Sequence, residues 1–184
     1  MIELYKPNVD DLWFKEMMMS DESTMSYNHG TIAFPESKWD SWYQRWMKDD
    51  KRFYRYICDE NTFVGEVAYY LDLEREIYIA DVIIYAPYRG KGYGHEGLSL
   101  LCEYAKNNGI AELYDDIAID NPSINLFLKY GFKEVLRTDE YVLVKKKLWI
   151  FSKKKALFAR NLLINVNYVK IYLLIRKISN GDFI

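Results

Sequence analysis

The sequence predicts an α+β fold in which helices flank one mixed, mostly antiparallel central sheet. Three strand-like segments, at about 53–59, 63–71 and 76–85, are joined by connections too short for a crossover helix, so these strands should be antiparallel. After them the expected order changes to helix, strand, helix, strand and strand. The chain has 184 residues, half of them apolar and 28% charged, a composition typical of a globular domain with its own core.

The N-terminal part is expected to begin with a strand at residues 1–5. Asp10 or Asp11 can cap a helix that runs to about Met19, and the polar, turn-rich residues 20–35 are expected to form a loop. A second helix is predicted over residues 36–48. It carries four aromatic residues at helical spacing, which favours a packed core face over a substrate-lining one: Trp39, Trp42, Tyr43 and Trp46.

The C-terminal part of the predicted domain contains two helices and three strands. The first helix runs to about Asn108, with Gly109 placed to end it. Asn121 can cap the second helix, Pro122 suits its first position and Gly131 follows its end. The strands are expected near residues 113–119, 132–137 and 141–147.

Charge is unevenly distributed along the chain. Residues 1–148 carry a net charge of −8, whereas residues 149–184 carry +6. An acidic domain repels nucleic acid and attracts cationic ligands. The basic and apolar segment 149–184 has three interpretations: packing on the domain or on a second subunit, an amphipathic anchor at an anionic membrane, or a poorly ordered extension. Its apolar content favours packing or a homodimer contact.

No apolar run in the sequence is long enough to cross a bilayer, and the N-terminus lacks the layout of a signal peptide. Cys58 and Cys102 have no metal-ligand spacing and suggest reduced, structural thiols. We therefore expect a cytoplasmic protein that uses no metal.

A glycine-rich segment, 83–94, runs from a strand into a helix start and ends in Arg89-Gly90-Lys91-Gly92-Tyr93-Gly94. Glycine allows close approach of the backbone to a ligand, and a helix N-terminus offers unpaired N–H groups with partial positive charge. Arg89 and Lys91 add full charges, so the segment predicts a site for a pyrophosphate.

Residues 92–97 also satisfy G-x-G-x-x-G, and Asp115 and Asp116 lie about 20 residues further on, as in a dinucleotide site. That site needs parallel strands with crossover helices, whereas the strands before this loop are joined by short turns. A dinucleotide-binding protein is therefore the lesser alternative.

The loop and the block from Asp120-Asn121 to Tyr130-Gly131-Phe132 resemble motifs of the Gcn5-related N-acetyltransferase (GNAT) family, and the resemblance covers about residues 1–148. It implies a sheet splayed between its fourth and fifth strands, with acetyl-coenzyme A as co-substrate. The residues implied to bind the coenzyme are Val82, Ile83 and Ile84 for the pantetheine, Arg89, Gly90, Lys91, Gly92, Tyr93 and Gly94 for the pyrophosphate, and Asn121 and Phe127 in the second block.

Phe127 stands where the family often has a tyrosine that protonates the departing thiolate, and phenylalanine cannot donate a proton. Tyr130 lies close to the same helical face and could replace it, or it could simply pack. The departure also motivates a second alternative, a non-catalytic acyl-coenzyme A sensor.

Acetyl transfer to an amine needs a group that accepts its proton. Asp81 is the candidate base, and strand alternation puts it on one face with Ile83 and Tyr85. Glu66, Asp116 and, in the loop before the aromatic helix, His29 are candidate substrate contacts. Asp115 and Asp116 alternate, so at most one of them is expected in the cleft, and a structural salt bridge is the alternative role for each acid. The sequence thus predicts an N-acetyltransferase acting by direct transfer on a small-molecule or peptide amine.

Overall fold

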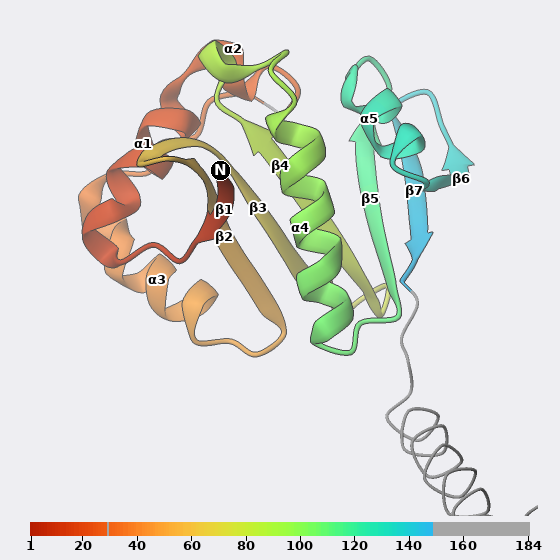
Figure 1. Cartoon of the computed structure of the whole chain (residues 1–184), viewed down its shortest axis with the longest axis horizontal. Coiled ribbons are helices and arrows are strands. Elements are labelled where there is room, and N and C mark those ends of the chain that lie inside the picture. Colours follow the sequence, from red (N-terminus) through yellow and green to blue (C-terminus); the bar gives the residue numbers. More distant parts are fainter. Residues whose placement is uncertain (29, 149–184) are drawn as a thin grey trace, which may run out of the picture. The chain divides into compact units, whose positions relative to one another are not determined.

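The computed structural model describes residues 1–28 and 30–148 of the chain (Figure 1). The predictions made for His29 and for segment 149–184, including a subunit contact, lie outside the described residues. A seven-stranded mixed sheet has the order β1-β2-β3-β4-β5-β7-β6. Its strands are β1 (Ile2–Tyr5), β2 (Arg52–Asp59), β3 (Thr62–Asp72), β4 (Ile77–Ile84), β5 (Glu112–Ala118), β6 (Lys133–Arg137) and β7 (Tyr141–Lys147).

Helices cover both faces of this sheet. They are α1 (Trp13–Ser20), α2 (Glu22–Met25), α3 (Trp39–Met47), α4 (Tyr93–Asn107) and α5 (Ser123–Lys129). Short 3-10 turns precede α1, α3 and α4 at Val9–Leu12, Glu36–Lys38 and Ala86–Tyr88. Figure 1 shows α4 lying across β3 and β4, with α5 beside β5 and β7. The predicted α+β class with helices flanking a mixed sheet is confirmed.

Two predictions for the N-terminal region were wrong in detail. The expected cap at Asp10 or Asp11 is absent, because α1 follows Leu12 without a side-chain cap. Asn8 instead caps the preceding 3-10 turn, and its backbone N–H donates to a carboxylate oxygen of Asp11 at 2.7 Å. The expected loop over residues 20–35 contains the one-turn helix α2, which Asp21 caps by accepting from the N–H of Thr24 at 2.6 Å. Local side-chain hydrogen bonds decided both.

Alternation along β2, β3 and β4 divides the apolar residues between two cores. One core lies beneath α4 and α5 and includes Leu98, Leu101 and Val67, while the other lies beneath α1 and α3 and includes Trp42 and Tyr54. The aromatic face of α3 is thus a core face, as the spacing predicted. Cys58 and Cys102 are buried free thiols.

Strands β4 and β5 are the only parallel neighbours in the described sheet, and they pair at a single position, Ile79 with Tyr114. By contrast, β3 and β4 pair along eight positions in antiparallel register. Beyond the bridge, the facing edges of β4 and β5 separate. The predicted splay between the fourth and fifth strands is therefore present, and it leaves a wedge that widens toward the carboxyl ends of both strands.

Candidate active site

The glycine-rich loop delivers a row of unpaired backbone donors to the wide end of the wedge. Gly90 and Gly92 have φ values of 77° and 91°, a conformation that glycine adopts at little cost. Gly92 is the N-cap of α4. Within the described part of the chain, no hydrogen bond uses the N–H groups of residues 90 to 94. Donors of this kind at a helix start fit a diphosphate.

Contacts with neighbouring elements fix the loop. The Tyr93 hydroxyl donates to Asp59 at the end of β2 at 2.8 Å. A Cβ at Gly97 would lie 2.5 Å from Ile57 Cδ1, so glycine lets α4 pack closely against the sheet. A Cβ at Gly94 would lie 3.2 Å from Leu126 Cδ2 in α5, so the space between the loop and α5 is narrow.

A cavity of about 300 Å³ opens at this loop and is called the loop cavity. Most of the residues predicted to bind coenzyme line it: Val82, Ile83, Ile84, Arg89, Gly90, Gly92, Tyr93, Gly94 and Asn121. Lys91 does not line it, and its ammonium lies 5.2 Å from the centre of the Tyr88 ring. Sequence reasoning missed Tyr27, Ser123 and Leu126, which also line it.

Phe127 of α5 and Tyr130, the residue that follows this helix, were the candidates for the position of a general acid, and neither lines the loop cavity. Phe127 is 2% exposed and its ring packs 4.9 Å from that of Phe132. The Tyr130 hydroxyl donates to Ser99 at 3.1 Å, and its carbonyl accepts from Lys146. The N-cap of α5 is Pro122, one residue later than the predicted Asn121, whose side-chain oxygen accepts from the N–H of Ser123 at 2.9 Å.

A second cavity, of about 490 Å³, is rich in carboxylates and is called the acidic cavity. Five acids line it: Glu66, Asp81, Asp115, Asp116 and Glu140. It shares Tyr27, Asn28 and Ile83 with the loop cavity, so the two cavities adjoin along β4. Lys15, Tyr70 and Tyr141 also line it, and no sequence pattern had singled them out.

Register explains why the carboxylates of β3 and β4 meet. Glu66 pairs with Ile83 and Ala68 pairs with Asp81, so alternation places Glu66 and Asp81 on the same face. Desolvation, reinforced by the negative charge of Glu66, raises the pKa of Asp81 to about 6. Desolvation and the charge of Asp81 also hold the pKa of Asp115 well above its usual range. These two acids therefore resist being charged together unless a cation joins them.

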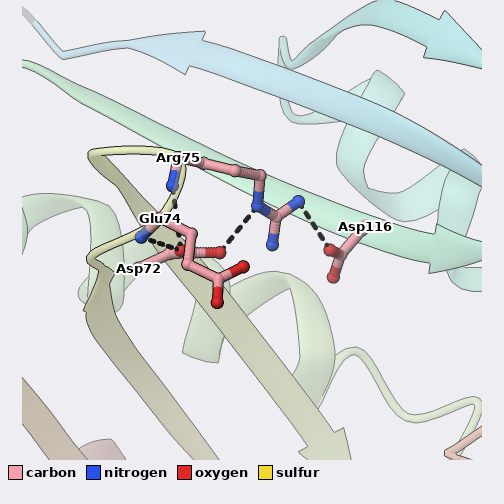
Figure 2. A network of polar contacts seen from close by, with 4 residues as sticks. All are labelled: Asp72, Glu74, Arg75 and Asp116. Carbon is pink, nitrogen blue, oxygen red and sulfur yellow. Dashed lines mark hydrogen bonds and ion pairs between the residues drawn. The ribbon is translucent and has the colours of Figure 1, made fainter.

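The expectation that at most one of Asp115 and Asp116 would reach the cleft was wrong, because both line the acidic cavity. Side chains of β5 still alternate between its two faces, but β5 has parted from β4 at this level, so the cavity between the strands reaches both positions. Figure 2 shows Arg75 reaching from the β3–β4 turn to Asp116 on β5. Its Nη1 lies 2.9 Å from Asp116 and its Nε 2.6 Å from Asp72, an ion-pair network near the start of β4.

Glu66 itself is held by a buried network. The ammonium of Lys15 lies 2.9 Å and 3.2 Å from the two carboxylate oxygens of Glu66, and the Tyr54 hydroxyl donates to the same carboxylate. Asp81 has no comparable partner: no ion pair or side-chain hydrogen bond to it occurs among the described residues. Among the described residues, Asp81 therefore differs from Glu66 in having no ion-pair partner.

Comparison with known proteins gives a consistent result. The family model described as the acetyltransferase (GNAT) family matches residues 14–132. No curated protein matches the sequence. Many solved structures share the fold at low identity. A spermidine N-acetyltransferase from Vibrio cholerae, solved with CoA and spermine, is 17% identical with a TM-score of 0.71 over 80% of this chain and 95% of its own.

Two further structures are similar. A GNAT acetyltransferase from Streptococcus pneumoniae is 16% identical, with a TM-score of 0.68 over 81% of this chain and 100% of its own. A phosphinothricin acetyltransferase from Sinorhizobium meliloti, solved with acetyl-CoA, is 16% identical, with a TM-score of 0.69 over 80% of this chain and 88% of its own. In this chain the strands before the glycine-rich loop are antiparallel, unlike those of a doubly wound dinucleotide-binding fold. This chain belongs to the acetyltransferase (GNAT) family.

Proposed function

We propose that this protein moves the acetyl group of acetyl-coenzyme A to a primary amine of a small molecule or peptide, by direct transfer with both substrates bound. The observation that carries the proposal is the junction of the two cavities at Ile83, Tyr27 and Asn28. A pantetheine arm along β4, with its diphosphate at the unpaired N–H groups of residues 90–94, would bring a thioester to this junction. Asp81 lines the acidic cavity on the other side.

The residues around the junction suit an amine acceptor. A primary amine is mostly protonated at neutral pH, so its nitrogen must lose a proton before it attacks the thioester carbonyl. Asp81, with a pKa of about 6 and no protein cation on it, is the proposed group that binds the ammonium and takes the proton, directly or through water. Solvent water then accepts this proton from Asp81.

The leaving thiolate needs less help. Phe127 has no proton to give and is buried, and the Tyr130 hydroxyl is engaged with Ser99 outside both cavities. We therefore assign the role of general acid to neither residue. The thiolate of coenzyme A is a tolerable leaving group, and the absence of an acid should cost rate, by on the order of 10²–10⁴, without preventing transfer.

The acceptor is proposed to be cationic, because five acids line the acidic cavity and Lys15, the one basic residue in that lining, is already paired with Glu66. The structurally similar spermidine N-acetyltransferase binds spermine. A polyamine, an aminoglycoside or a lysine-bearing peptide would each place further ammonium groups among these carboxylates.

The test is thiol release from acetyl-coenzyme A with a panel of acceptors: spermine, spermidine, an aminoglycoside, a lysine-bearing peptide and neutral alcohols of similar size. Turnover is expected with amines and not with the alcohols. Asp81→Asn should lose most of that turnover while binding coenzyme A as the parent does. Binding of coenzyme A without turnover on any amine would contradict the enzyme and support the alternative, a non-catalytic sensor.

A further inference from the structure

Arg89, the first residue of the phosphate loop, is directed at the protein's own backbone. Its Nη1 donates to the carbonyl of Ser23 at 2.9 Å and its Nη2 to the carbonyl of Thr24 at 2.8 Å. Its Nε donates to the carbonyl of Ile84 at 3.3 Å. Three of the five N–H donors of the guanidinium are therefore committed to carbonyl oxygens. Two of those oxygens belong to α2, the short helix that the sequence did not predict.

Thr24 makes a second connection between the same two segments. Its hydroxyl accepts from the backbone N–H of Ala86 at 2.9 Å, and the residue is fully buried. Its own N–H donates to Asp21, and hydrogen bonding to Thr24, with a smaller contribution from the charge of Arg89, lowers the pKa of Asp21. Thr24 is thus docked on the segment from Ile84 to Arg89 through both its side chain and its carbonyl.

The position of α2 matters because the residues that follow it line both cavities. The N–H of Asn28 donates to the carbonyl of Met25 at 2.9 Å, so the position of the turn after α2 depends on the position of the helix. Tyr27 and Asn28 then lie at the junction of the loop cavity and the acidic cavity. Whatever holds α2 therefore sets the boundary between the coenzyme side and the acceptor side.

We propose that Arg89 is a positioning residue that, together with Thr24, ties α2 to the phosphate loop and so shapes the acceptor side of the active site. The phosphate is then bound by the backbone donors of residues 90–94, with Arg89 contributing little of the affinity. The kinetic consequences rest on the function proposed above, whereas the tie between α2 and the loop does not.

Hydrogen exchange on the ligand-free protein tests the tie by itself. Arg89→Gln and the near-isosteric Thr24→Val should each speed exchange of the amides of Met25 and Asn28 by about tenfold or more, the effect of losing roughly 1.4 kcal/mol of local stability. Thr24→Ser keeps the hydroxyl acceptor and should exchange as the parent does. Lys91→Gln, which changes the other basic residue of the loop, is the matched control and should also leave these amides unchanged. Parent-like exchange in Arg89→Gln would overturn the proposal.

Titration with coenzyme A separates positioning from direct phosphate binding. Loss of a hydrogen bond between charged groups typically costs about 10- to 100-fold in affinity, so a phosphate-binding Arg89 would show that loss in Arg89→Gln. We expect instead a change of about threefold or less in Kd, with Thr24→Val behaving like Arg89→Gln. A tenfold weakening in Arg89→Gln that Thr24→Val does not share would overturn the proposal.

Kinetics complete the test with the amine that gives the highest rate in the acceptor panel. Arg89→Gln and Thr24→Val should raise the KM for the amine by about tenfold, while the KM for acetyl-coenzyme A stays within about threefold because the coenzyme keeps the backbone donors of residues 90–94. A tenfold rise in the KM for acetyl-coenzyme A with an unchanged KM for the amine would contradict the proposal. Should the parent acetylate no amine, the proposed function fails, and the exchange and titration results still decide the role of Arg89.

Discussion

The ammonium of Lys15 lies 2.9 Å from a carboxylate oxygen of Glu66, and the two residues are 7% and 3% exposed at the edge of the acidic cavity. The rings of Trp42 and Tyr54 lie 5.2 Å and 5.0 Å from the same ammonium. Two opposite charges are thus enclosed by aromatic residues, and each depends on the other for its counter-charge. The pair also sets the electrostatic surroundings of Asp81, because Glu66 raises its pKa and Lys15 lowers it.

Removal of one member of this pair should be costly. Lys15→Met leaves the carboxylate of Glu66 buried without its cation, and we expect about 3–5 kcal/mol less stability in urea unfolding at pH 7. The double variant Lys15→Met/Glu66→Gln should recover part of that loss. Lys48→Met, at an exposed position, is the control and should stay within about 0.5 kcal/mol of the parent. A loss below 1 kcal/mol in the single variant would contradict the dependence of the buried Glu66 on this cation.

Acetyl transfer should lose rate as the pH falls through about 6. A base works only when deprotonated, and desolvation together with the charge of Glu66 raises the pKa of Asp81 to about 6. We expect kcat/KM to rise through this pH and then to level off. In Asp81→Asn the residual rate should lack this inflection. An unchanged profile in the variant would remove Asp81 from the proton transfer.

The same raised pKa has an effect on stability. A carboxyl group whose folded-state pKa lies above its unfolded value favours folding most below about pH 4, and that contribution is lost as the pH rises through about 6. Asp81→Asn should therefore stabilise the protein relative to the parent at pH 7, by on the order of 1 kcal/mol, and change little at pH 4. Paired thermal unfolding curves at the two pH values would measure the difference. Equal effects at both would count against a raised pKa.

Gly65→Ala should damage the coenzyme side of the site through the backbone of β4. A Cβ at Gly65 would lie 2.4 Å from the carbonyl oxygen of Ile83, which cannot move without shifting the strand that lines the loop cavity. We expect a loss of about 1–3 kcal/mol in stability and a weaker titration with coenzyme A. At Gly97 the nearest atom is the flexible end of Ile57, so Gly97→Ala should cost stability with a smaller effect on that titration.

Phe127→Tyr should not restore a general acid. The ring is buried against Phe132, so the added hydroxyl would be enclosed without a partner, which typically costs about 1–3 kcal/mol. Thermal unfolding should show the loss, and kcat should not increase. A faster enzyme would mean that this side chain can reach the thiolate.

Local patterns predicted most of the fold. Glycines at Gly90 and Gly92, the apolar stripe of α4 and the alternation in β4 each depend on a few neighbouring residues, and the structure agrees with them. The short connections of the three central strands were sufficient to predict their antiparallel pairing. The resemblance to an acetyltransferase family then supplied the splay, which local pattern could not indicate.

Features that depend on distant partners escaped prediction. Lys15 sits in a segment that looks like an ordinary helix start, and the partner that makes its burial tolerable is 51 residues away. The short helix α2 is stabilised in part by Arg89, 65 residues beyond Thr24. A short stretch of sequence contains only one partner of each of these two contacts. Glu66, Asp81 and one acid of β5 were expected to converge on one cleft, but only the register of β3 and β4 shows that Glu66 and Asp81 share a face, and no pattern indicated Glu140.

Because β4 and β5 share only one bridge pair, the sheet consists of two parts with a short connection: β1 to β4 form one part and β5 to β7 form the other. Little backbone hydrogen bonding opposes separation of the two parts, and the bridge pair lies at the same end of the sheet as the Arg75 ion pairs. A molecule bound between the two parts could form hydrogen bonds with the unpaired backbone groups of β4 and β5. The force needed to separate the two parts of the sheet should therefore depend on whether a ligand is bound between them.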